Sequence, residues 1–201
     1  MARHQPPDVR RAQLFEAAMR VCAEKGYHAT TVVEIASRAG LSKGALYHHF
    51  KSKQELFVSL LEESMDMFAR MIDALTPSGS TRDALRQVLR AALAAYPPET
   101  RSGMVEFMVL CLREPAFRER FVRHYQGMVE AGARLVQRGV ERGELRAGLD
   151  ADRASRLFFF GTDGLMVMLT ALGRGDEADQ AAIDLLDCLL DGFAARSAGA
   201  A

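Results

Sequence analysis

The chain has 201 residues, of which 49% are apolar and 26% are charged, so it holds enough apolar material for the core of a globular protein. No apolar run follows the basic start, and the most apolar window, residues 157–172, is too short for a bilayer and contains Asp163. A secreted or membrane-spanning protein is therefore not expected. The three cysteines are far apart without metal or redox spacing, which fits a structural role in the cytoplasm.

The formal net charge is zero, which taken alone argues against a nucleic-acid partner. The distribution of charge points the other way. Residues 1–55 hold nine Lys and Arg against five Asp and Glu, a net charge of +4, and residues 56–201 carry −4. A small basic segment on an acidic body favours a DNA-binding module joined to a second domain.

Helical periodicity runs through almost the whole chain, which predicts an all-α fold of about nine helices. The first helix covers about residues 8–25 and ends at Gly26. Thr31 opens the second helix with Glu34 three positions on, the pattern of a capping box, and Gly40 ends it. Ser42 is expected to cap a short third helix.

A second capping-box pattern, Ser52 with Glu55, begins a long fourth helix that ends near residues 76–80. Prolines 97 and 98 break the chain after the fifth helix, and Pro115 suits the first position of the seventh. The expected later helices cover about residues 101–113, 115–142, 151–172 and 177–196. The domains expected are a DNA-binding head at 1–55, a body at 56–196 for ligand binding and dimerisation, and a disordered tail at 197–201.

The second and third short helices are separated by "RAGLS", residues 38–42, which gives a helix-turn-helix pattern. In that motif the second helix lies in the major groove. On the third helix, Leu46 and Phe50 should face inward, and Lys43, Gly44 and Tyr47 should face outward. Gly44 costs a helix about 1 kcal/mol relative to Ala, so its position favours a close approach of backbone to DNA. The alternative is an ordinary solvated face.

The stretch "GYHATTVVEIASRAGLSKGALYHHFKSKQELF", residues 26–57, resembles the N-terminal region of the TetR-type (tetracycline repressor) family of transcriptional regulators. Two departures are Cys22, where an aromatic residue is common, and His48, at a variable position. The resemblance implies a homodimer that binds a near-palindromic double-stranded DNA operator. It also implies phosphate contacts from Thr30, Thr31, Tyr47, His49 and Lys53, base contacts from Ser42, Lys43 and Gly44, and further contacts from Arg10, Arg11 and His48.

The last two helices carry more apolar residues than a single stripe, so both sides of each helix should be buried. The resemblance implies that they pair with their copies in a four-helix bundle. The alternative is a core helix of a monomer. The interface residues expected are Leu165, Met168, Leu172, Ala182, Leu185, Leu186, Leu189 and Phe193.

The middle helices should enclose a cavity for a small, lipophilic effector, because a few polar groups stand among Met and Phe residues. For three of the polar groups there is an alternative: Glu106 facing solvent, His124 satisfied at the surface, and Asp163 bonded across the dimer. The pocket residues expected are Met104, Glu106, Phe107, Met108, Cys111, His124, Tyr125, Met128, Phe159, Thr162, Asp163 and Met166.

These features favour a repressor that a lipophilic ligand releases from DNA. A regulator without a ligand, or one that senses oxidation through Cys111 or Cys188, is the alternative. An enzyme is less favoured, because the sequence has no nucleophile–base–acid set, no metal-ligand spacing and no phosphate loop. No metal or cofactor is expected.

Overall fold

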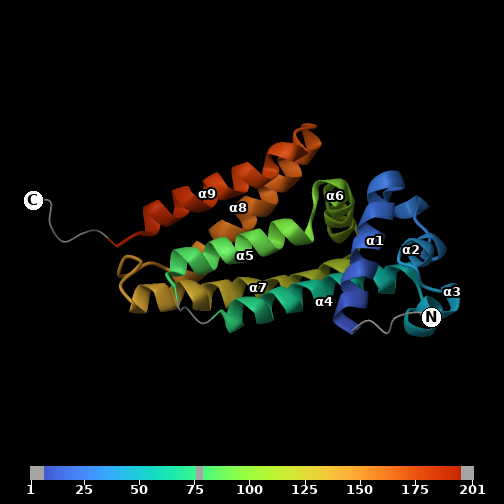
Figure 1. The fold of residues 1–201 in the computed structure, drawn as a ribbon, viewed down its shortest axis with the longest axis horizontal. Coiled ribbons are helices and arrows are strands. Elements are labelled where there is room, and N and C mark those ends of the chain that lie inside the picture. The colour runs from blue at the N-terminus through green and yellow to red at the C-terminus, as the bar shows by residue number, and fades with distance from the viewer. Residues whose placement is uncertain (1–6, 76–78, 196–201) are drawn as a thin grey trace, which may run out of the picture. The chain divides into compact units, whose positions relative to one another are not determined.

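The computed structural model describes residues 7–75 and 79–195, and in these ranges the chain forms nine α-helices and no strand (Figure 1). The expected all-α fold is therefore confirmed. The helices are α1 Pro7–Ala29, α2 Val32–Arg38, α3 Lys43–His49, α4 Lys53–Ala74, α5 Thr81–Ala95, α6 Pro98–Arg113, α7 Pro115–Glu141, α8 Ala151–Ala171 and α9 Ala178–Phe193, with a short 3-10 turn at Gly175–Glu177.

The helix boundaries follow the capping residues of the sequence. Thr31 and Glu34 form the reciprocal capping box that opens α2. At α4 only half of the expected box forms: Ser52 Oγ accepts the N–H of Glu55 at 3.0 Å, but the Glu55 carboxylate accepts the N–H of Lys51 at 2.7 Å. Gly26 interrupts α1 with φ 77° and ψ 160°, a conformation that residues with a Cβ rarely adopt.

One compact unit contains residues 1–65 and 97–124, which include α1 to α3, the first half of α4, α6 and the start of α7. Its core is formed by α1, α4 and α6, with Leu61 and Phe107 almost fully buried. At Gly103 the backbone of α6 touches α1, since a Cβ there would lie 2.3 Å from the carbonyl oxygen of Met19. The α6 helix is therefore packed into the same unit as the helix-turn-helix segment.

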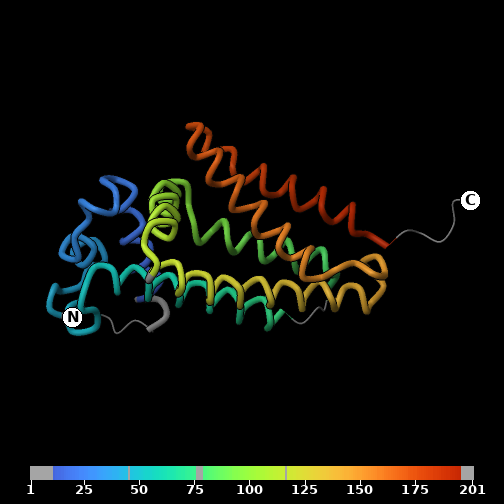
Figure 2. Tube along the Cα trace, turned by 180° about the vertical axis from the view of Figure 1, so that it is seen from behind, coloured from blue at the N-terminus to red at the C-terminus, as the bar shows by residue number. Residues whose placement is uncertain are grey.

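The second unit contains residues 66–96 and 125–201. In it α8 and α9 run side by side in opposite directions, joined by a tight turn (Figure 2). Its main core cluster includes Ile72, Leu135, Phe158 and Leu186. The boundary expected at residue 55 separates a DNA-binding head from a body for ligand binding and dimerisation. It is a division by function, which the packing of the two units does not test, and it stays a prediction. None of the described helices has the length and apolar character needed to cross a membrane.

Candidate nucleic-acid interface and apolar cavity

The short helix α3 has a buried side and an exposed side. Leu46 is 2% exposed and anchors the helix in its unit, while Lys43, Gly44 and Tyr47 lie on the surface. The ammonium of Lys43 is 5.6 Å from the centre of the Tyr47 ring. A Cβ built at Gly44 would have no heavy atom within 4 Å, so this part of the helix is open to a partner.

The residues around α3 divide between surface and interior. Thr31, Ser42, His48 and His49 are exposed, and the two histidine rings are 5.3 Å apart at 74°. Thr30 is only 2% exposed, and its hydroxyl donates to the carbonyl of Gly26 at 2.8 Å. The expected phosphate contact from the Thr30 side chain therefore does not fit this structure.

Cations differ in how far they are free to meet a phosphate. Arg11 is exposed and lies 3.3 Å from the carboxylate of Glu63. Lys43 and Lys51 form no ion pair with any carboxylate in the described ranges. The side chain of Arg10 lies outside the described residues. Positive charge that is not matched by a neighbouring carboxylate therefore gathers at and just after α3.

Lys53 holds the turn between α1 and α2. Its ammonium donates to the carbonyl oxygens of Tyr27, His28 and Thr30 at 2.7, 3.0 and 2.9 Å, and lies 4.4 Å from the centre of the Tyr27 ring. Burial lowers the pKa of this ammonium. Three donors are all that an ammonium has, so a phosphate contact from Lys53 would compete with these bonds. The sequence alone did not predict that Lys53 holds this turn.

Replacing Lys53 by Ala should lower the free energy of unfolding by about 1–3 kcal/mol, because three carbonyls at the turn lose their donor. The exposed Lys51 gives a matched control, because Lys51→Ala removes the same charge. Urea unfolding of the two variants at equal concentration measures the difference. Equal stabilities would show that the Lys53 bonds do not hold the turn.

Half of the expected pocket residues lie in the unit that contains α6, and most of these are core or surface residues there. Met104, Phe107 and Cys111 are at most 5% exposed. Burial raises the pKa of Cys111 to about 12, so its thiol is protonated at neutral pH. Glu106 is exposed, and its carboxylate accepts the N–H of Tyr27 at 3.4 Å.

His124 and Met108 are the other two expected pocket residues in the unit that contains α6. The Nε2 of His124 lies 3.3 Å from the Glu62 carboxylate, which also binds Arg120 at 2.6 Å. Met108 is partly buried. His124 is thus part of a charged cluster within its unit, close to the expected alternative of a satisfied histidine.

In the second unit the structure joins two of the expected pocket residues. The hydroxyl of Tyr125 donates to the Asp163 carboxylate at 2.5 Å, and the Tyr125 ring stacks on Phe160. Burial raises the pKa of Asp163 to about 6, and the hydrogen bond from Tyr125 opposes this rise. The Thr162 hydroxyl is bonded to carbonyls of its own helix at 3.0 Å, and Met128 packs against the main core cluster. Met166 is partly buried.

The pKa of Asp163 predicts how stability depends on pH. The folded state holds this proton up to about pH 6, whereas the unfolded chain releases it near pH 3.8, so ionised Asp163 costs stability as the pH rises between these values. Asp163→Asn keeps an acceptor for Tyr125 and removes the titration. Its stability relative to wild type should rise by up to roughly 3 kcal/mol as the pH increases from below 4 to about 7, and it should level off above that.

Thermal unfolding across this pH range at one protein concentration tests this dependence on Asp163. Asp184 is exposed on α9, so Asp184→Asn is the control for the loss of one surface carboxylate. Parallel pH curves for wild type and Asp163→Asn would show that the folded pKa of Asp163 is not raised.

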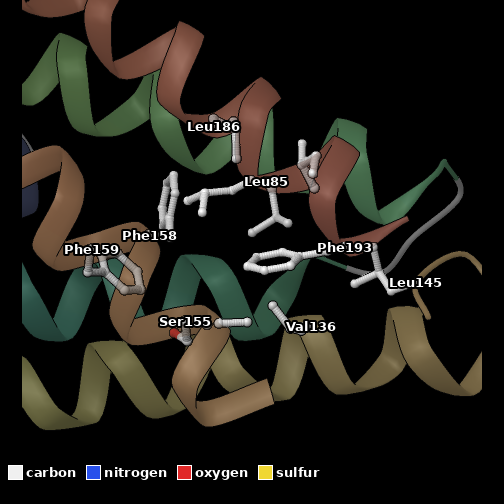
Figure 3. A pocket seen from close by; sticks show the side chains of 12 residues that line it. Leu85, Val136, Leu145, Ser155, Phe158, Phe159, Leu186 and Phe193 are labelled. Carbon is white, nitrogen blue, oxygen red and sulfur yellow. The ribbon is translucent and has the colours of Figure 1, made fainter. Parts of the chain in front are cut away.

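The second unit contains an apolar cavity of about 20 Å³ between α5, α7, α8 and α9 (Figure 3). Of the expected pocket residues only Phe159 lines it. Leu189 and Phe193, expected at the dimer interface, line it as well. The lining residues are Leu85, Gly132, Val136, Leu145, Ala154, Ser155, Phe158, Phe159, Leu186, Leu189, Leu190 and Phe193.

Two glycines seven residues apart on α7 are a sequence signal for this region, although only Gly132 lines the cavity. A Cβ at Gly132 would lie 2.5 Å from Ser155 Oγ, and a Cβ at Gly139 would lie 2.6 Å from Thr81 Oγ1. Both glycines therefore mark close packing of α7 against its neighbours. The leucines of the lining are common core residues and carry no such signal.

Some of the residues expected at a dimer interface are buried in the core, and others are exposed. Ala182 and Leu186 are at most 3% exposed and belong to the core of the chain itself, which corrects their assignment to an interface. Leu165 and Leu185 are partly buried, and Met168 and Leu172 are 58% and 63% exposed. Exposed apolar side chains lie at helical spacing along α8 and at the residue that follows it: Leu157, Phe160, Met168 and Leu172.

The chain is similar in sequence and in fold to known regulatory proteins. A fatty acid metabolism regulator protein of Bacillus subtilis is 28% identical over 75% of this chain and 77% of its own, and the repressor KstR2 of Mycobacterium tuberculosis is 31% identical over 73% and 74%. The crystal structure of FadR from Bacillus subtilis in complex with stearoyl-CoA superposes with a TM-score of 0.65 at 25% identity, covering 90% of this chain and 98% of that one.

Two family descriptions cover most of the sequence. Residues 14–60 match the tetR family of bacterial regulatory proteins, and residues 75–189 match the tetracyclin repressor-like C-terminal domain. The first match spans the helix-turn-helix segment, and the second spans α5 to α8 and most of α9. The chain belongs to the TetR family of transcriptional regulators.

Proposed function

We propose that this TetR-family regulator is a cytoplasmic repressor that binds a near-palindromic operator as a homodimer and is released by a lipophilic small molecule. The observation that carries the proposal is the exposed side of α3, where Lys43, Gly44 and Tyr47 stand free of the core that holds Leu46. A short helix with this division suits insertion into a major groove.

The DNA contacts proposed follow the exposure of the side chains. Lys43 and Gly44 meet base edges together with Ser42. Tyr47, His49, Thr31 and Arg11 contact phosphates on either side, with His48 and Lys51 near the backbone. Phosphate contacts set the register of the helix, and the few groove residues read the sequence. Lys53 acts on this surface through the turn that it holds.

Gly44→Leu should fold as stably as wild type or better, because Leu favours a helix over Gly by up to about 1 kcal/mol and the site is open. On DNA the new side chain should hold α3 out of the groove. We expect a loss of roughly 3 kcal/mol or more of specific operator binding, the value of one to three base contacts. Titration of a duplex selected from random DNA measures the loss.

Gly192 is the matched control, because it is also helical and exposed with nothing near its missing Cβ. Gly192→Leu should keep wild-type affinity. Unchanged affinity in Gly44→Leu would show that Gly44 does not face the DNA.

The homodimer is supported by the apolar stripe on α8. Large apolar side chains rarely line one exposed face of a monomeric protein without a partner. Leu157, Phe160, Met168 and Leu172 line such a face. We therefore assign the interface to this stripe, with the exposed Ile183 of α9 as a further member.

Met168→Glu should weaken dimerisation by at least about 2 kcal/mol, more than tenfold in the dissociation constant, because a charge would be buried without a partner. Met67 is a matched control, since it is 47% exposed against 58% for Met168 but lies on α4. Sedimentation over a dilution series compares Met168→Glu with Met67→Glu. Equal dissociation constants would place the interface elsewhere.

A lipophilic effector is supported by the apolar cavity of the second unit and by the names of relatives that act in fatty acid metabolism or bind stearoyl-CoA. Ligand binding would favour one of two states of the dimer that differ in DNA affinity. The protonated thiol of the buried Cys111 disfavours oxidation sensing through that residue. The named relatives are regulators, which supports a role other than catalysis.

A further inference from the structure

The cavity of the second unit offers an occupant only hydrocarbon surface. Eleven of its twelve lining residues have no polar side-chain atom. The exception is Ser155, whose hydroxyl donates to the carbonyl of Val129 at 2.7 Å and is committed to the contact between α8 and α7. A polar group placed in the cavity would therefore lose its hydrogen bonds to water without replacement.

Water itself is a poor occupant. A cavity must offer the centre of a water molecule about 10–15 Å³ to hold one water, and the water needs two to four polar partners. The cavity has about 20 Å³, which is enough space, but its lining supplies no free partner. A small apolar group, such as the methyl end of a chain, satisfies both the space and the chemistry.

Two sides of the cavity cannot easily move apart. At Gly132 the backbone of α7 is so close to α8 that a Cβ would lie 2.5 Å from Ser155 Oγ and 2.8 Å from the Phe159 ring. The loop that carries Leu145 is tied to the end of α9 by the N–H of Arg146, which donates to the Phe193 carbonyl at 2.8 Å. The close approach at Gly132 and the backbone bond between Arg146 and Phe193 therefore restrain these two sides of the cavity.

The remaining side consists of leucine side chains on α5 and α9, which Figure 3 shows facing the same space as Phe158 and Phe193. Leucines can change rotamer at modest cost. At Gly132, by contrast, the α7 backbone lies against the side chains of Ser155 and Phe159, and the Ser155 hydroxyl is itself bonded to the Val129 carbonyl of α7. The cavity can therefore lengthen along the leucines more easily than it can widen between the helices. A thin, flexible chain meets this condition and a rigid polycyclic group does not.

We infer that this cavity seats the methyl end of an unbranched alkyl chain, with the polar group of the ligand outside it. The inference deepens the proposed function, since it names the effector class as straight-chain rather than ring-shaped. Val136 lines the cavity on α7 and is a specificity-determining residue, because its size sets how far the chain end can enter.

Calorimetric titration of the full-length protein with undecanoic acid and with adamantane-1-carboxylic acid tests the inference, because the two acids have equal carbon number and the same head group. We expect the straight chain to bind at least about tenfold more tightly, the value of one well-placed methylene in an apolar pocket. Equal affinities, preference for the ring, or no binding of either acid would overturn the inference.

Val136→Leu adds one methylene to the cavity wall and should weaken undecanoic acid binding by about tenfold with unchanged melting. Val105 is partly buried on α6 in the other unit, so Val105→Leu is the control and should bind as wild type. Equal binding by both variants would place the chain elsewhere. The comparison of the two acids on wild type decides the inference even if Val136→Leu misfolds.

Operator titration with and without undecanoic acid separates this inference from the proposed function. Chain binding without a change in operator affinity would leave the cavity assignment standing and remove ligand-controlled release. Intact operator binding with no affinity for either acid would remove the cavity assignment and leave the DNA-binding role.

Discussion

The ammonium of Lys53 is the contact on which the DNA-facing surface depends. It binds three carbonyl oxygens at the turn after Gly26, where the backbone leaves the helical region and α1 gives way to α2. That turn sets the direction of α2, and α2 with the following turn sets that of α3. A partly buried charge bonded in this way orders the outward-facing side of α3 without itself having to meet the DNA.

Much of this fold could be predicted from the sequence, because the signals are local. Thr31 with Glu34 and Pro115 each act within a few residues, and the structure has the helix start that each one predicts. Gly26 was expected to end the first helix, but in the structure it interrupts α1, which continues to Ala29. The capping pair at Ser52 was only half correct, since the carboxylate of Glu55 can reach the N–H of Lys51 instead. The inward face of Leu46 likewise follows from helical spacing.

The sites in the later helices were predicted less well, because they depend on which side of each helix meets which neighbour. The helical spacing on α9 predicts that Leu186 lies on an apolar face, but it does not tell which partner covers that face. The packing against α5 and α8 shows that Leu186 lies in the core of its own chain. In the same way Glu106 stands in an apolar run, yet its carboxylate lies at the Tyr27 N–H. Long-range partners such as Tyr125 with Asp163 leave no trace in sequence spacing.

The two packed units have separate physical features: one has an outward-facing helix with unmatched positive charge, and the other has an apolar cavity and an exposed apolar stripe. A crystal structure of the protein bound to a duplex selected from random DNA tests the central claim of this account most directly. The account predicts Lys43 and Gly44 against base edges in the major groove, with Lys53 still bonded to its three carbonyls. A complex in which another surface of the head meets the bases would contradict it.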